Sequence, residues 1–256
     1  MGLRKVNCLF KTMDIIGMRS SKTHYLPDSV GFYSTNNSES LATDLCHSIG
    51  EILTETIRTR GRASMALSGG ITPIPLFKEL SLLNIDWMKV DLAITDDRWV
   101  DPKNADSNEL LVRTHLIKNK ASKVNFIPLK NNAKTAKDGQ KNSEEMLKNI
   151  TLPFDVVVLG MGSDGHTASL FPCSDELSEA MNLNNLNCLI STSPKTAPYE
   201  RLSLTARVII DAKNVFLHLN GSSKLHTLES AMEYKDPNKM PIYAFLENGL
   251  SIYWSP

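Results

Sequence analysis

The stretch FDVVVLGMGSDGHTASLFP, residues 154–172, decides the fold of this chain. Its first half contains the aliphatic run Val156 to Leu159 between a proline and a glycine, which is typical of a buried strand in a parallel sheet. Its second half, Gly160 to Ala168, gathers three glycines and several polar side chains into a turn that leads into a helix or a bend. Ligands of open α/β sheets bind beyond the carboxyl ends of the strands. The stretch therefore predicts a strand followed by a ligand-binding turn.

Two side chains of this turn, Asp164 and His166, are candidates for catalysis. A carboxylate that accepts a hydrogen bond from one ring nitrogen of a histidine leaves the other nitrogen free to take a proton from water. A glycine such as Gly162 lets the backbone approach a ligand closely and point its amide at it. Without further context, the same residues also fit an aspartate that caps the turn and an ordinary polar histidine.

The composition indicates a soluble globular protein with one large α/β domain or two small ones. The chain has 256 residues, of which 41% are hydrophobic and 22% charged, and its formal net charge is zero. We therefore expect neither nucleic acid nor a membrane surface as a partner, and any anion must be recognised locally. No stretch approaches the roughly 20 apolar residues that span a bilayer. The four cysteines are irregularly spaced without a C-x-x-C pair, which predicts free thiols and a cytoplasmic protein, with a disulfide as the alternative.

Residues 1–25 are basic, with a single acidic residue, and lack the long apolar core of a secretory signal. We expect them to form a poorly ordered arm, with a transit-peptide-like leader or a later start at Met13 or Met18 as alternatives. Residues 26–256 are expected to form one domain. Whether the protein is a monomer or a homodimer is left open by the sequence.

From residue 38 onward, helical and strand patterns alternate, without repeats or linkers. This alternation predicts a single doubly wound, mostly parallel sheet flanked by helices, a Rossmann-like α/β fold in three layers. The predicted strands cover residues 63–67, 90–94, 124–128, 156–159, 189–192 and 215–219, and the predicted helices cover 38–60, 73–83 and 108–117, part of 131–149, a segment beginning near 220 and part of 240–254.

Two further strand ends carry polar groups. In SGGITP, residues 68–73, a glycine turn precedes a proline that opens a helix, with Thr72 placed to cap it. The free amides of such a helix start bind phosphate, although a plain tight turn is the alternative. The strand ending at Ile94 runs into Asp96, Asp97 and Arg98. Charge runs of this kind are usually solvated loops with a surface ion pair.

Several of these segments together resemble the 6-phosphogluconolactonases, and more loosely the related glucosamine-6-phosphate deaminases. The resemblance extends from about Ser64 to the C-terminus. Its motifs are LSGGITP (67–73), TDDRWV (95–100) with the downstream DSN (106–108), GMGSDGHTASLFP (160–172), PYERLSLT (198–205) and GSSK (221–224). The chain departs from the usual pattern at Ile71, Asp97 and Ser203, where Ser, Glu and Thr are commoner.

The resemblance implies hydrolysis of 6-phospho-D-glucono-1,5-lactone to 6-phospho-D-gluconate, a step of the oxidative pentose phosphate pathway, with no cofactor or metal. By this resemblance His166 is the general base, Asp164 orients it, and Arg98 stabilises negative charge on the lactone oxygen. The residues implied in phosphate and substrate binding are Ser68, Gly69, Gly70, Thr72, Asp96, Gly162, Arg201 and Lys224.

Two alternatives are weighed against this reading. Glucosamine-6-phosphate deaminases carry a glutamate five residues after the histidine, where this chain has Phe171, which transfers no proton. A sugar-phosphate-sensing domain of a transcriptional regulator needs a DNA-binding module, and the arm of about 25 residues is too short for a helix-turn-helix. His218 and His226, which flank the GSSK motif, are interpreted as structural.

Overall fold

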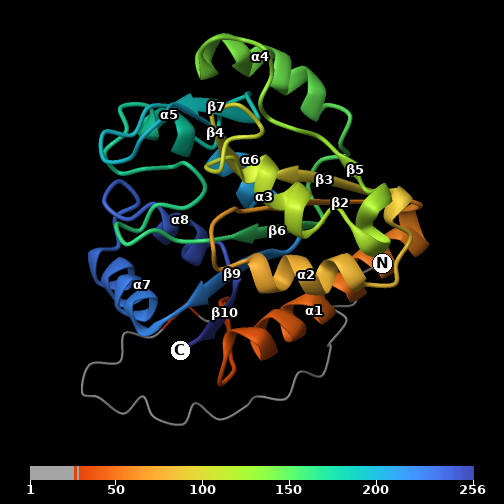
Figure 1. Cartoon of the computed structure of the whole chain (residues 1–256). Coiled ribbons are helices and arrows are strands. Elements are labelled where there is room, and N and C mark those ends of the chain that lie inside the picture. Colours follow the sequence, from red (N-terminus) through yellow and green to blue (C-terminus); the bar gives the residue numbers. More distant parts are fainter. Residues whose placement is uncertain (1–25, 28) are drawn as a thin grey trace, which may run out of the picture.

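The computed structural model describes residues 26–27 and 29–256, which form one large and one small sheet. The large sheet has the strand order β1-β10-β9-β6-β2-β3-β5, and its strands pair in parallel. This arrangement confirms the predicted mostly parallel α/β sheet (Figure 1). Its strands are β1 (Gly31–Ser34), β2 (Ala63–Leu67), β3 (Val90–Ile94), β5 (Asn125–Phe126), β6 (Val156–Leu159), β9 (Val215–Asn220) and β10 (Ser251–Ser255).

The chain changes direction across this sheet between β2 and β6. From β2 it proceeds outward to β3 and β5, and from β6 it proceeds the other way to β9 and β10. Every residue of β2, β3 and β6 is buried, because both faces of the sheet are covered. The loops that follow β2 and β6 diverge at this switch point and leave a crevice, which is where such sheets bind ligands.

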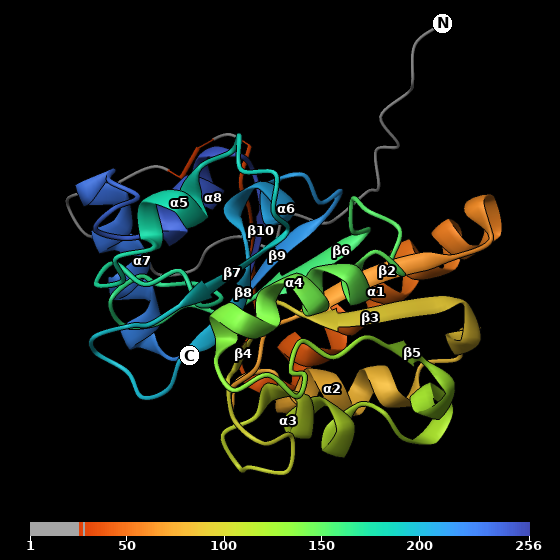
Figure 2. The ribbon, with the colours of Figure 1, turned by 90° about the horizontal axis from the view of Figure 1, so that it is seen from above.

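Helices cover one face of the large sheet, and the small sheet with α4 lies over the other (Figures 1 and 2). Helices α1 and α2 pack together on the first face. The helices are α1 (Ser38–Arg60), α2 (Ile74–Leu82), α3 (Asn108–His115), α4 (Ala136–Leu147), α5 (Leu177–Met181), α6 (Ala206–Ile210), α7 (Ser222–Tyr234) and α8 (Ile242–Glu247), and the short 3-10 helices are η1 (Trp87–Lys89) and η2 (Asn119–Lys123).

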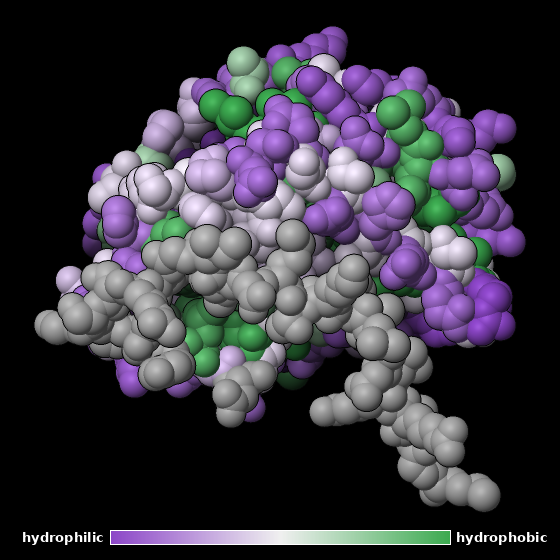
Figure 3. Space-filling model, turned by 90° about the horizontal axis from the view of Figure 1, so that it is seen from below, coloured by the Kyte–Doolittle hydropathy of each residue, from purple (hydrophilic) through white to green (hydrophobic). Residues whose placement is uncertain are grey.

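Helix α1 illustrates how sequence pattern becomes packing. Leu41, Leu45, Ile49 and Leu53 recur at four-residue steps and are completely buried, while the opposite side of the helix meets solvent. Gly61 ends the helix in a left-handed conformation. Figure 3 shows the molecule from below relative to Figure 1. The coloured part of this surface is mostly hydrophilic, with apolar residues in scattered patches. Within the described ranges, every helix is too short or too polar to cross a membrane.

The small sheet was not predicted. It is antiparallel, with β4 (Asp96–Arg98), β8 (Arg201–Leu204) and β7 (Leu189–Thr192) in the order β4-β8-β7. Strand β4 consists of three charged residues, so neither propensity nor alternation marks it as a strand. It becomes one by pairing with β8, about a hundred residues further along the chain. This pairing brings two distant polar segments to the same edge of the crevice.

Smaller differences concern the starts of two helices and the ends of the chain. Helix α1 begins after Asn37, which caps it by accepting a hydrogen bond from the amide of Ser40. Helix α2 begins after Pro73 without a side-chain cap, so the prediction that Thr72 caps it is wrong. The predicted arm, residues 1–25, lies outside the described residues, as does the first of the four cysteines; the other three are free thiols.

Candidate functional site

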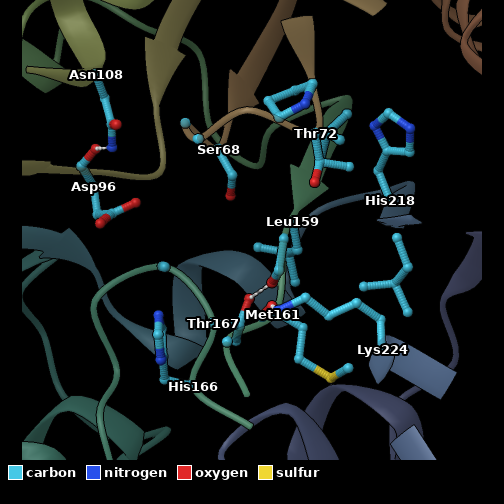
Figure 4. Close-up of a pocket in the computed structure, with 18 of the residues that line it drawn as sticks. Ser68, Thr72, Asp96, Asn108, Leu159, Met161, His166, Thr167, His218 and Lys224 are labelled. Atoms are coloured by element: carbon cyan, nitrogen blue, oxygen red, sulfur yellow. Dashed lines mark hydrogen bonds between the residues drawn. The ribbon is translucent and has the colours of Figure 1, made fainter. Parts of the chain in front are cut away.

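A cavity of about 220 Å³ lies at the switch point, beyond the carboxyl ends of β2 and β6 (Figure 4). Every site residue predicted from the sequence lines it except Asp164, whose carboxylate is hydrogen-bonded to His166. These residues are Ser68, Gly69, Gly70, Thr72, Asp96, Arg98, Gly162, His166, Arg201 and Lys224. Five separate motifs of the sequence therefore converge on one space.

Asp164 is hydrogen-bonded to the Nδ1 atom of His166. The distance from Nδ1 to Asp164 Oδ1 is 2.5 Å, and the same oxygen accepts a hydrogen bond from the His166 amide at 3.2 Å. Partial burial raises the pKa of the Asp164 carboxyl. The hydrogen bond and charge of His166 lower it by more than burial raises it, so the pKa lies below its usual value. The carboxylate is thus ionised at neutral pH and accepts a hydrogen bond from the N–H of Nδ1. Nε2 is left as the nitrogen that can take a proton from water.

The turn after β6 takes its shape from glycines. The amide of Gly162 donates to the carbonyl of His166 at 2.8 Å, and Gly165 has a φ of 74°, a conformation that favours glycine. A Cβ atom on Gly162 would lie 2.1 Å from His166 Nδ1, so the imidazole occupies the space that any other side chain would need. Glycine at this position is what allows the ring to lie against the backbone.

Phe171 contacts two of the predicted site residues. Its ring stacks on the His166 imidazole, with centroids 3.9 Å apart and planes inclined by 23°, and the Arg201 guanidinium carbon lies 5.1 Å from its centroid. Stacking and cation–π contacts of this kind fix the orientation of both groups. The position that would carry a proton-transferring glutamate in a deaminase thus holds an aromatic ring stacked on His166.

Arg98 and Arg201 are directly opposite each other in the β4–β8 ladder. Burial lowers the pKa of Arg201, and the charge of Arg98 lowers it too while Asp96 raises it, yet a guanidinium remains protonated. Within the described residues, the buried Nε atoms of both arginines lack a hydrogen-bond partner. Like charges directly opposite each other are unfavourable. Two adjacent cations with unused donors therefore favour an anionic ligand.

The two aspartates of β4 have different environments. Asp96 faces the cavity and accepts hydrogen bonds from Ser169 Oγ at 2.5 Å and Thr95 Oγ1 at 3.1 Å. Asp97 points away and accepts from the amides of Asn108 and Glu109 at the start of α3, at 2.7 and 3.1 Å. Burial raises the pKa of Asp97 to about 6, against the opposing effect of these backbone donors. The departure from the family pattern at Asp97 therefore falls on a helix cap.

The loop from Ser68 to Pro73 and Lys224 also contribute to the lining of the cavity. Gly70 has a φ of 98°, and a Cβ atom on Gly69 would lie 1.9 Å from Asn108 Oδ1. Lys224 donates from Nζ to the carbonyl of Met161 at 2.7 Å, which holds its ammonium at the cavity. The loop amides precede the positive end of α2, so loop and lysine together suit a phosphate. Ile71 is 86% exposed, so its departure from serine changes the rim of the loop.

Asn108, Thr167 and His218 are among the lining residues that were not predicted as part of the site. Thr167 donates to the carbonyl of Gly160 at 2.8 Å and thereby shapes the turn after β6. His218 sits within the apolar strand β9, and an ionisable residue in such a strand is the one signal that the sequence offered.

Comparison with known proteins places this geometry in a family. Residues 36–254 match the family model described as glucosamine-6-phosphate isomerases/6-phosphogluconolactonase. The 6-phosphogluconolactonase of Pseudomonas putida is 38% identical over 232 residues, covering 90% of this chain and 95% of its own length. That of Rhizobium meliloti is 38% identical over 231 residues, covering 89% of this chain and all of its own length.

The same relationship appears in three dimensions. The crystal structure of a 6-phosphogluconolactonase from Shewanella baltica superposes with a TM-score of 0.86 at 41% identity, covering 89% of this chain and 98% of its own. The chain belongs to the glucosamine-6-phosphate isomerase/6-phosphogluconolactonase family.

Proposed function

We propose that this protein hydrolyses 6-phospho-D-glucono-1,5-lactone to 6-phospho-D-gluconate. One observation carries the proposal: His166, held by Asp164 at 2.5 Å, lines the same cavity as the cationic groups of Arg98 and Lys224. A base at one end of a cavity and a phosphate site at the other match a phosphosugar whose reacting carbonyl lies remote from its phosphate. The relatives named 6-phosphogluconolactonase support the same substrate.

In the proposed reaction, His166 Nε2 takes a proton from a water molecule that attacks C1 of the lactone. Asp164 accepts a hydrogen bond from the N–H of Nδ1 and stabilises the imidazolium that forms. The new C1–oxygen bond produces a tetrahedral oxyanion, and the guanidinium of Arg98 lies in the cavity to stabilise its charge. The oxyanion then collapses, the bond from C1 to the ring oxygen breaks, and the imidazolium returns its proton to that oxygen. The carboxylic acid formed ionises to water, and no metal takes part in any step.

Phe171 supports this role of His166. Stacking at 3.9 Å restricts rotation of the imidazole, and the hydrogen bond at Nδ1 fixes which nitrogen faces the substrate. Positioning of this kind contributes to the rate of the reaction, because a reacting group must be close to its attack geometry before the chemical step.

The phosphate is assigned to the Ser68–Thr72 loop, Lys224 and Arg201. The loop directly precedes α2, and Lys224 lines the same cavity. Arg201 is included because the family motif implies it, although its strand partner is Arg98. Replacing Arg201 with alanine should mainly raise KM; an unchanged KM with a collapsed kcat would assign it to the lactone end instead.

The test uses freshly prepared 6-phosphogluconolactone, with product measured through an NADP-dependent phosphogluconate dehydrogenase. The unaided opening of the lactone is subtracted. Wild type should accelerate the reaction, His166→Ala should abolish most of this acceleration with phosphate-ester affinity retained, and the exposed His226→Ala should behave as wild type. Equal turnover by His166→Ala would remove this residue from the role of base.

The same preparations test the two alternatives. Ammonia release from glucosamine 6-phosphate would indicate a deaminase, which the stacking of Phe171 on His166 disfavours because no proton-transferring group stands at that position. Binding of 6-phosphogluconate without any lactone turnover would indicate a sensing domain.

A further inference from the structure

His218 is a buried polar side chain in an otherwise apolar strand. It lies in β9 between Leu217 and Leu219 and is 4% exposed. A polar group in such a place costs about 1–3 kcal/mol if it lacks a hydrogen bond, so nearly all of them have partners. Within the described residues, His218 Nδ1 has none.

Unpaired buried nitrogens gather around one cavity. The buried side-chain nitrogens without a partner in the described part of the chain are Nε of Arg98, Nε of Arg201 and Nδ1 of His218, and all three residues line the cavity. All other buried side-chain nitrogens of the described residues have a hydrogen-bond partner. Donors left unsatisfied around a single space indicate a ligand rich in acceptor oxygens.

The strand register places His218 on the phosphate side of this space. His218 is opposite Tyr253 of β10, whose hydroxyl is 2.8 Å from Ser48 Oγ of α1, so both side chains lie on the face covered by α1 and α2. The loop before α2 is the proposed phosphate site. Two residues after His218, β9 ends and the chain turns into α7, which carries Lys224.

His218 is separated from the catalytic pair. Figure 4 shows His218 and His166 on opposite sides of the cavity. A role in proton transfer to or from the lactone is therefore excluded by position, whereas contact with a group bound between the loop and Lys224 is compatible with it.

We propose that His218 is a ligand of the substrate's phosphate group, donating a ring N–H to a phosphate oxygen beside Lys224 and the Ser68–Thr72 loop. The proposal rests on the proposed function in that a phosphosugar occupies this cavity. Burial lowers the pKa of His218 to about 4, so in the free protein the ring is neutral and adds a donor without adding a charge. Its contribution is recognition of a phosphate oxygen, in addition to the charge that Lys224 supplies.

The test compares the affinity for 6-phosphogluconate with that for gluconate, which lacks the phosphate, by calorimetry. His218→Leu removes the donor, His218→Gln restores an N–H on a similar side chain, and the exposed His226→Gln is the matched control. We expect His218→Leu to bind 6-phosphogluconate about tenfold more weakly, the value of one hydrogen bond to a charged group, with the affinity for gluconate unchanged. His218→Gln should recover most of this loss.

Kinetics with the lactone give an independent readout. For His218→Leu, KM should rise by a similar factor while kcat stays within about twofold of wild type. Wild-type affinity for 6-phosphogluconate in His218→Leu would overturn the proposal, as would a loss in kcat that His218→Gln shares. If wild type binds 6-phosphogluconate through His218 but hydrolyses no lactone, the proposed reaction fails and this assignment stands.

Discussion

Replacing His218 with leucine should change how the stability of the protein depends on pH. His218 is neutral in the folded protein, where burial lowers its pKa to about 4, whereas in the unfolded chain its pKa is the ordinary 6.5. Between these two values the unfolded chain binds a proton that the folded protein does not. Stability is therefore complete above pH 6.5 and is lost as the pH falls toward 4.

The size of the effect follows from the two pKa values. Between pH 7 and pH 5, protonation of His218 in the unfolded chain lowers the free energy of unfolding by about 2 kcal/mol, and by pH 4 by about 3 kcal/mol. Burial raises the pKa of Asp97 to about 6, which acts in the opposite direction because the folded protein then binds the extra proton. Asp97 is present in wild type and variant alike. The difference between the two proteins therefore isolates His218.

The assay is urea unfolding of wild type and His218→Leu at pH 7 and pH 5, without phosphate in the buffer. Relative to the variant, wild type should lose about 2 kcal/mol over this interval, or about 0.7 M in the urea midpoint if the slope is about 3 kcal/mol per M. Leucine keeps the apolar character of β9, so the variant should remain folded. Equal losses in the two proteins would refute the reasoning, because they would mean that the folded protein accommodates a charged His218.

Three further predictions concern packing around the site. Gly162→Ala should lower kcat by about a hundredfold with little change in KM, because a Cβ atom 2.1 Å from His166 Nδ1 must displace the ring; a near-normal kcat would show that the ring is free to move. Phe171→Leu should lower kcat/KM about tenfold through the lost stacking, and Phe171→Tyr should retain it. Gly69→Ala should reduce the free energy of unfolding by about 1–3 kcal/mol, and the second change Asn108→Ala should recover part of this loss, since the clash is with the Asn108 side chain; additive losses in a double-mutant cycle would contradict that cause.

The parallel sheet and its loops were predictable because their signals are local. Aliphatic runs such as Val156–Leu159 mark buried strands, and the glycine and polar clusters after them mark the edge where ligands bind. Four segments at such positions were expected to share one crevice, and the structure brings them together. What each residue does there stays a prediction.

Features that depend on pairing between distant segments of the chain were not predicted from the sequence. Asp96–Arg98 read as a charged loop and is a strand only because β8 pairs with it. Thr72 has the residue type of a helix cap, but the helix begins after Pro73 and Thr72 lines the cavity. His218 was interpreted as structural because periodicity gives the burial of a residue but not the presence of a hydrogen-bond partner.

The pairing of Arg98 with Arg201 also determines the stage of folding at which the candidate ligand site is formed. Their strands are separated by about a hundred residues, and contacts over such distances form slowly because closing a long loop costs entropy. A chain synthesised only as far as α4 contains Arg98 but neither β8 nor Lys224. On the proposed assignment of Arg98, Arg201 and Lys224 to the ligand, affinity for an anionic sugar should arise only when the last third of the chain has docked, which would make ligand binding a reporter of completed folding. For the same reason, the ligand stabilises the finished protein and gives no support to its folding intermediates.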